Sequence, residues 1–263
     1  MTSLETWFWV FLFVVVLPAV AVGGALYVRR TVGTDVLARH NDVAGFIYAV
    51  VGVVYAVLLG FTAIIVWEQF QNAQDNVERE ADALADLFRN SQVFPAEVRD
   101  AVELHVRTYA QLVVEKEWAA MANGQTSSEA WTEYNEIWRT YHQFVPPDDH
   151  QRLWYAESLH RLNTLADSRR DRLLSMESGV PAVMWGVLIG GGVITIAFSF
   201  LFGTQNARAQ SIMTAGLALM IGGMLLSIFA LQNPFAGITR VDSEPFEQVG
   251  RILEQWRHLV GAP

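Results

Sequence analysis

The chain has 263 residues, of which 52% are hydrophobic and 17% are charged, and its formal net charge is −9. The charged share lies below the roughly 25% of an ordinary globular domain, and a net negative chain is a poor partner for nucleic acid. It has no cysteine, which excludes disulfides, thiol catalysis and cysteine-ligated metals. Charges are nearly absent from four windows and dense between the second and third. That distribution is typical of a membrane protein with a water-soluble insert.

Four segments are long and apolar enough to cross a bilayer core of about 30 Å, which takes about 20 helical residues. We predict them at about residues 7–28, 45–67, 181–202 and 211–231. Pro18 lies inside the first, where membrane helices tolerate a proline as a kink. The residues before this segment include no Lys or Arg, so we expect a retained helix and not a cleaved signal peptide.

The region between the two pairs of spans, residues 68–180, has helical periodicity throughout. No Gly or Pro separates it from the second span, which predicts one long helix that continues from the span into the insert. Pro95 begins a second helix, Asn123–Gly124 marks a turn, and Pro146–Pro147 ends a third helix. We therefore expect an insert of about four helices in a bundle.

Four aromatic residues recur along the third predicted helix of the insert. A ligand-binding cage is one interpretation, but a place in the core of the insert is the more common outcome for aromatic residues at helical spacing. We expect core positions for Trp131, Tyr134, Trp138 and Tyr141.

The predicted organisation is thus an all-α membrane protein with four transmembrane helices, arranged two and two around a helical-bundle insert. Residues 1–67 hold the first pair of spans, 68–180 the insert, and 181–231 the second pair. Residues 232–263 form a C-terminal tail with a short helix.

Positive charges near the span ends give a weak preference for one orientation. The loop of residues 29–44 holds Arg29, Arg30 and Arg39, and the loop near 203–210 holds Arg208. This count favours cytoplasmic loops and an extracytoplasmic insert. An opposing cluster lies on the insert side shortly before the third span, at Arg169, Arg170 and Arg172.

Motifs for catalysis or metal binding are not found. None of the six histidines forms a ligand pair of the HExxH type, no GxSxG nucleophile elbow occurs, and no span has a clear acidic or basic residue within it. We therefore expect no enzyme activity, no metal and no cofactor. Uncharged spans also argue against an ion-coupled transporter, but they are compatible with a passive pore that an apolar constriction gates.

The second predicted span has two different faces. Small residues recur on one face and allow close helix packing, which is most simply packing within the chain: Gly45, Ala49, Gly52, Ala56 and Gly60. The opposite face has bulky residues that give way to polar ones: Val54, Leu58, Phe61 and Ile65, then Glu68, Gln69 and Asn72. This second stripe could face lipid and then water.

In a symmetric oligomer the same stripe could line a pore. Leu58, Phe61 and Ile65 would then form a hydrophobic neck, and Glu68, Gln69 and Asn72 a polar mouth. Glu68 would favour cations or only border the mouth.

Six segments of the sequence resemble the bestrophin-like domain family of bacterial and plant membrane proteins. They are Asn41–Tyr48, Gly52–Phe61, Val66–Phe70, Glu80–Leu87, Phe198–Gly203 and Asn233–Gly237. The family is named for a distant likeness to bestrophins, which are pentameric anion channels with two spans on each side of a cytosolic helical region. The resemblance implies a similar layout, channel function and a cytoplasmic insert, but no bestrophin pore motif matches residue by residue.

Two functions follow from these observations. The first is a homo-oligomeric ion channel whose pore the second span lines. By analogy with bestrophins it would be pentameric and anion-conducting. The second is a non-conducting membrane scaffold or sensor that acts through its acidic helical insert. For either function we expect a multi-pass protein of the bacterial inner membrane, with the lipid bilayer and, for a channel, inorganic ions as partners.

Overall fold

The computed structural model describes residues 3–177 and 179–260, and every regular element among them is helical. The chain divides into two compact units, which are considered separately. One consists of Met1–Glu68, Gly179–Gln232 and Gly237–Thr239, and the other of Gln69–Ser178, Asn233–Ala236 and Arg240–Pro263. The first two residues, residue 178 of the insert and the last three residues of the tail lie outside the described part.

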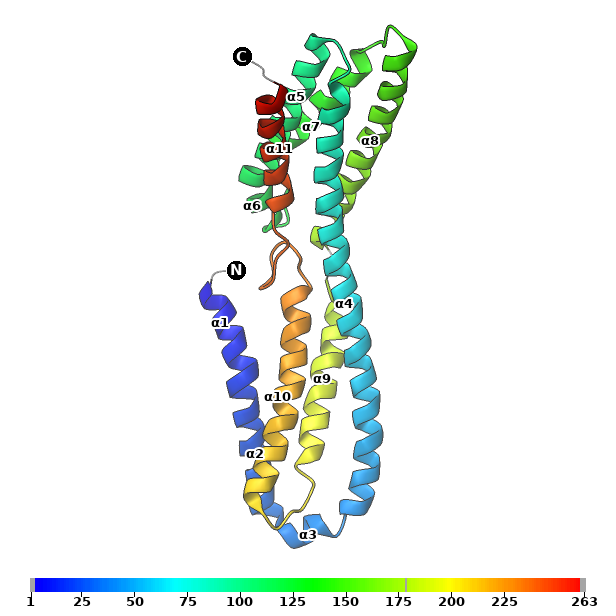
Figure 1. Ribbon diagram of the computed structural model, residues 1–263. Helices are drawn as coiled ribbons and strands as arrows, with labels where there is room; N and C mark the ends of the chain where they lie inside the picture. Colours follow the sequence, from blue (N-terminus) through cyan, green and yellow to red (C-terminus); the bar gives the residue numbers. More distant parts are fainter. Residues whose placement is uncertain (1–2, 178, 261–263) are drawn as a thin grey trace. The chain divides into compact units, whose positions relative to one another are not determined.

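Four helices of the first unit are long and apolar enough to cross a membrane: Thr6–Val32, the apolar part of Asn41–Ser91, Ala182–Ser199 and Ala207–Leu231. In Figure 1 they are α1 (Ser3–Phe11) with α2 (Leu17–Val32), α4 (Asn41–Ser91), α9 (Ala182–Ser199) and α10 (Ala207–Leu231). The predicted fold class, an all-α membrane protein with four transmembrane helices, is confirmed.

A π-helical turn, Leu12–Val16, joins α1 to α2 just before Pro18. Proline lacks the amide hydrogen that would bond four residues back, and a π-turn is a common way for a helix to absorb such a break. The kink expected at Pro18 therefore takes the form of a short π-helical turn just before the proline.

The buried side chains of the first unit form one apolar core. It includes Ala21, Tyr55, Leu59, Val66, Leu188, Ile196, Ala218, Ile221, Leu225 and Ile228. Glycines allow close approach in this unit: for example, a Cβ at Gly222 would lie 2.7 Å from the carbonyl oxygen of Phe13, and one at Gly191 would lie 2.6 Å from the ring of Tyr55. The Tyr55 hydroxyl donates to the carbonyl oxygen of Leu188 at 2.9 Å.

Polar contacts hold the two short loops of this unit together. Asn41 donates to the carbonyl oxygen of Gly203 and accepts from its amide, at 2.9 and 3.0 Å. Arg29 donates to the carbonyl oxygens of Thr204 and Gln205. Part of the positive charge that the orientation count used is therefore engaged in the fold.

The second unit contains the C-terminal part of α4 together with the other helices of the insert. They are α5 (Ala96–Leu112), the π-turn η2 (Val113–Glu117), α6 (Trp118–Met121), α7 (Ser128–Gln143), α8 (Asp149–Leu174) and the 3₁₀ turn η3 (Ser175–Glu177). The side chains of Ser127 and Asp148 cap α7 and α8 by accepting from backbone amides. The long continuous helix and the breaks near Pro95, Gly124 and Pro147 agree with the sequence prediction.

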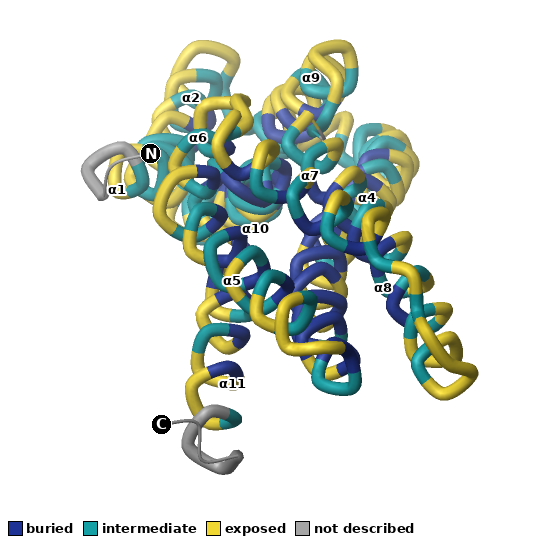
Figure 2. The backbone as a smooth tube through the Cα atoms, turned by 90° about the horizontal axis from the view of Figure 1, so that it is seen from above, coloured by how far each residue is buried: buried dark blue, intermediate teal, exposed yellow. Residues whose placement is uncertain are grey.

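The helix α11 (Glu244–Val260) from the C-terminal tail packs against α5. Its buried residues Phe246, Val249 and Leu253 face the insert, and its tube alternates between buried and exposed positions (Figure 2). The tail therefore supplies part of the core of the second unit.

The aromatic residues of α7 differ in burial. Tyr141 is completely buried and Tyr134 nearly so, as expected. Trp138 is only partly buried, and Trp131 is 54% exposed. The prediction that Trp131 is a core residue is wrong, because it lies on the outer edge of α7 at an open cavity.

Candidate pore helix and buried ion-pair cluster

The membrane part of α4 packs within its own chain through one narrow face. Tyr55, Leu59, Thr62 and Val66 are buried there. A helix turns by about 100° per residue, so both stripes seen in the sequence lie about 90–100° away from this face, on opposite sides of it.

The bulky stripe is largely uncovered within the chain. Phe61 is 65% exposed and Ile65 53% exposed, while Leu58 is half-buried. Among the polar residues that follow, Glu68 and Asn72 are exposed and Gln69 is half-buried. All six predicted pore residues thus share one side of α4, and none of them is fully buried, although Leu58 packs against the apolar core of its own chain.

The small-residue stripe is also uncovered. A Cβ added at Gly52 or Gly60 would meet no described atom within 4 Å, and Ala49 and Ala56 are exposed. Only Gly45 has a neighbour, at 3.8 Å from the ring of Phe202. Packing within the chain, the simplest interpretation of the sequence, therefore does not occur at Gly52 and Gly60, because Tyr55 and Leu59 form the packing face in their place.

Four charged side chains are completely buried in the second unit. Glu80 comes from α4, Glu117 from η2, and Arg169 and Arg172 from α8. The Arg172 guanidinium donates to Glu80 at 2.6 and 3.0 Å and to Glu117 at 2.7 Å. Arg169 donates to both oxygens of Glu117 at 2.8 Å. The two arginines balance the two carboxylates, so the cluster is formally neutral.

Aromatic residues surround this cluster. The Tyr109 hydroxyl accepts from Arg169 at 2.6 Å and donates to Glu80. The guanidinium carbons of the arginines also lie 5.3 to 5.7 Å from ring centroids, a distance at which a cation is attracted to an aromatic face. The rings belong to Tyr109, Trp131 and Tyr134 for Arg169, and to Trp118 and Phe246 for Arg172.

A family model described as the bestrophin-like domain matches residues 15–246. The chain belongs to the bestrophin-like domain family. No curated protein sequence matches it.

Solved structures share the fold of this family member. Two crystal structures are single-substitution variants of a bacterial bestrophin homologue from Klebsiella pneumoniae, each 12% identical to the chain. One has a TM-score of 0.69 and covers 95% of this chain and 99% of its own, and the other a TM-score of 0.70 with coverages of 92% and 99%. A crystal structure described as that of a membrane protein is 13% identical, with a TM-score of 0.68 and coverages of 92% and 97%.

In this bestrophin-like chain the buried surroundings favour the charged forms of Glu117 and Arg172. Burial disfavours the carboxylate of Glu117, but Arg172 and Arg169 outweigh it and hold the pKa of Glu117 below its ordinary value. Burial likewise disfavours the charged form of Arg172, yet Glu80 and Glu117 raise its pKa well above the ordinary value. Glu117 and Arg172 therefore form an ion pair and not a pair of neutralised groups.

Sequence reasoning did not find this cluster. The sequence indicates Arg169 and Arg172 only as topology signals, and Glu80 only as the first residue of a segment that resembles the family. One signal was present, because Glu80 lies three residues after Val77 and four before Leu84, on the face of the helix that is otherwise apolar. An acidic residue on a buried face implies a basic partner, but the partner's place in the chain could not be read from spacing.

No group of three or more His, Asp or Glu within residues 3–177 and 179–260 is placed to hold a metal ion. That the chain needs no metal and is not an enzyme stays a prediction.

Proposed function

We propose that the chain is one subunit of a homo-oligomeric ion channel in which the membrane part of α4 lines the pore. One observation carries the proposal: α4 leaves two stripes uncovered by its own chain, one small and one bulky. Neighbouring subunits could pack on the small stripe. The bulky stripe would then face the axis, with Leu58, Phe61 and Ile65 as the neck and Glu68, Gln69 and Asn72 as the mouth.

The family and the fold support this function. The matched protein from Klebsiella pneumoniae is described as a bacterial bestrophin homologue, and bestrophins are anion channels with a similar layout of spans and insert. Assembly as a pentamer and conduction of anions follow by this analogy, which concerns the fold and not the pore chemistry. Glu68 near the mouth would instead favour cations, so the sign of the ion is a result that the experiment must supply.

Flux through liposomes that contain the purified protein tests the proposal. Chloride and potassium are compared under an imposed gradient, with empty liposomes as the background. We expect flux above background, increased by Phe61→Ala and by Ile65→Ala because each shortens a neck side chain. Glu68→Gln should change the ratio of chloride to potassium flux.

Ile64→Ala is the matched control. Ile64 is 55% exposed, at the same depth as Ile65, and lies about 100° around the helix from it. It should leave flux unchanged. Unaltered flux in all the stripe variants would remove these residues from the pore. If neither ion passes at several pH values, with and without calcium, the scaffold or sensor function of the acidic insert would be favoured.

We propose the bacterial inner membrane as the location, while two arguments disagree on orientation. With Arg29, Arg169 and Arg172 engaged in the fold, the loop side keeps Arg30, Arg39 and Arg208, which favours a cytoplasmic position for the loops. The family analogy places the insert in the cytoplasm.

Because the chain has no cysteine, single cysteines at Ser128 and Asp35 can be labelled with an impermeant maleimide in intact cells. Labelling at Ser128 supports the charge count, and labelling at Asp35 the family analogy.

A further inference from the structure

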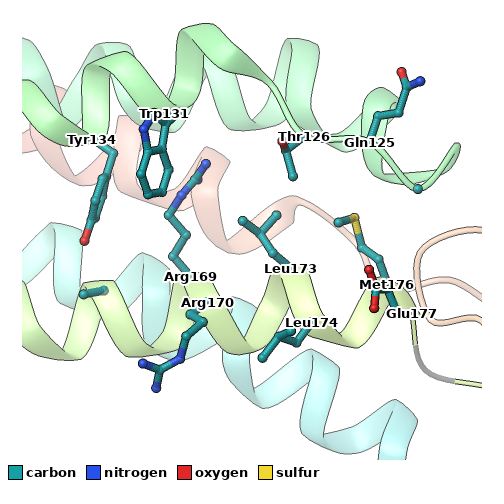
Figure 3. Close-up of a pocket in the computed structure, with 12 residues that line it drawn as sticks. Gln125, Thr126, Trp131, Tyr134, Arg169, Arg170, Leu173, Leu174, Met176 and Glu177 are labelled. Carbon is teal, nitrogen blue, oxygen red and sulfur yellow. The ribbon is translucent and has the colours of Figure 1, made fainter.

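The second unit contains a cavity of about 770 Å³ that the proposed channel function does not use. It lies between the start of α7 with its preceding loop and the C-terminal end of α8 with η3 (Figure 3). Its volume falls within the range of about 300–1,000 Å³ that is usual for small-molecule sites. It is therefore large enough for a ligand.

The walls of this cavity are mainly apolar. Trp131 and Tyr134 from α7 and Leu173 and Met176 from the end of α8 and from η3 line it. Arg170 also borders it, but Figure 3 shows its side chain directed away from α7, and it pairs with Asp167 on the surface. The apolar walls suit a hydrocarbon or aromatic group.

The cavity is also lined by the polar residues Gln125, Thr126 and Glu177, but its buried polar side chain is that of Arg169, which is only 2% exposed. Its two terminal nitrogens donate to Glu117 and Tyr109. Its Nε is buried and has no acceptor among the described residues. A buried donor without a partner costs free energy, more so when the group is charged, and a ligand oxygen at Nε would remove that cost.

The neighbouring arginine indicates which acceptor fits. Arg172 binds two carboxylates, those of Glu80 and Glu117. Arg169 binds only one, that of Glu117, although it is buried in the same aromatic surroundings. A hydrogen bond to an ionised acceptor is about twice as strong as one between neutral groups, so a second carboxylate at Arg169 would complete the pattern already present at Arg172.

We propose that this cavity binds an amphipathic carboxylate, such as a medium-chain fatty acid. One carboxylate oxygen accepts from Arg169 Nε, and the apolar chain packs on Trp131 and Leu173. The proposal concerns binding to the insert and holds whether or not the protein conducts ions.

Equilibrium dialysis of radiolabelled decanoate against the full chain in nanodiscs tests it, with empty nanodiscs as the background for partition into lipid. We expect saturable binding of one decanoate per chain. Decanol, which has the same chain without the carboxylate, should compete at least tenfold more weakly. Arg169→Lys keeps the positive charge but loses the Nε donor, and should weaken binding at least tenfold.

Because Arg169→Lys disturbs a buried cluster, a second variant leaves that cluster intact. Ala166 lines the cavity, so Ala166→Trp should fill it and abolish binding. Ala156→Trp, at an exposed position of the same helix, should bind like the unaltered chain. The proposal is overturned by binding no greater than in empty nanodiscs, by equal competition from decanol, or by undiminished binding to Ala166→Trp.

Discussion

Replacing Arg172 with methionine tests whether the buried cluster stabilises the insert. Arg172 is completely buried and bridges the two carboxylates directly, at 2.6 Å from Glu80 and 2.7 Å from Glu117. Methionine has a similar length and suits an apolar site, so the change removes the charge with little loss of volume. Glu117 keeps Arg169, but Glu80 keeps only the hydroxyl of Tyr109.

The expected loss follows from leaving Glu80 buried without a cationic partner. Breaking one side of a buried pair costs about 3–5 kcal/mol, a large part of the 5–15 kcal/mol that stabilises a typical domain. Each kcal/mol lowers the melting temperature by roughly 2–4 °C for a chain of about 150–250 residues. Arg172→Met should therefore lower the unfolding temperature by about 6–20 °C.

Thermal unfolding of the protein in nanodiscs, followed by circular dichroism, measures this shift. Arg170→Met is the matched control, because Arg170 is a near neighbour on the same helix but forms surface ion pairs, which contribute little. A shift of less than about 3 °C for Arg172→Met, or one no larger than that for Arg170→Met, would refute the stabilising role of the cluster.

Combining Arg172→Met with Glu80→Gln separates the lost ion pair from lost packing. Glutamine removes the orphaned charge, so the double variant should be more stable than Arg172→Met alone. If the effects of the two single changes simply add, the two side chains are not coupled and the ion-pair argument fails.

Three further predictions concern the membrane unit and the dependence on pH. Gly203→Ala should destabilise the fold by about 1–3 kcal/mol through overpacking, because its Cβ would lie 2.4 Å from the backbone nitrogen of Ala38. Thermal unfolding measures this loss. The control Gly186→Ala should be nearly neutral, because a Cβ there would meet no described atom within 4 Å. Gly52→Leu should reduce the oligomer fraction in native mass spectrometry without lowering the helix content, and an unchanged oligomer would show that this stripe faces lipid. The pKa of Glu117 is depressed below its ordinary value of 4.5 in the folded state, so its contribution is complete above about pH 4.5 and is lost as the pH falls through the lower folded pKa. The unfolding temperature should therefore fall more steeply as the pH drops below 4.5 in the unaltered chain than in Glu117→Gln, and parallel curves would contradict the assignment.

The helical framework could be predicted because each of its signals is local. Four apolar runs near bilayer length define the spans, and the proline at position 95 and the turn at Gly124 separate helices where backbone chemistry requires a break. The unbroken run from the second span into the insert likewise predicted a single α4, which the structure confirms as Asn41–Ser91. These features depend on residues that are neighbours in sequence.

The contacts between distant segments could not be predicted in the same way. Arg172 meets Glu80 across 92 positions of the chain, and α11 supplies Phe246 to the same core. Nothing in the spacing of either segment specifies the other. Trp131 and Tyr134, only three residues apart on one helix, differ in exposure although both line the same cavity, and their spacing does not predict that difference.

Burial has a different meaning in each unit, and α4 belongs to both. In the insert, which we predict to lie in water, the buried Glu80 is paired with Arg172 and the exposed face of α4 is polar. In the membrane, an uncovered apolar residue carries no cost, since lipid is as apolar as a protein core. Ile64 and Ile65 are almost equally exposed in a single chain, at 55% and 53%, although the proposed pore includes only one of them. Their difference can arise only from neighbouring subunits, which is why this pair, with matched size and depth, separates a pore-lining side chain from a lipid-facing one.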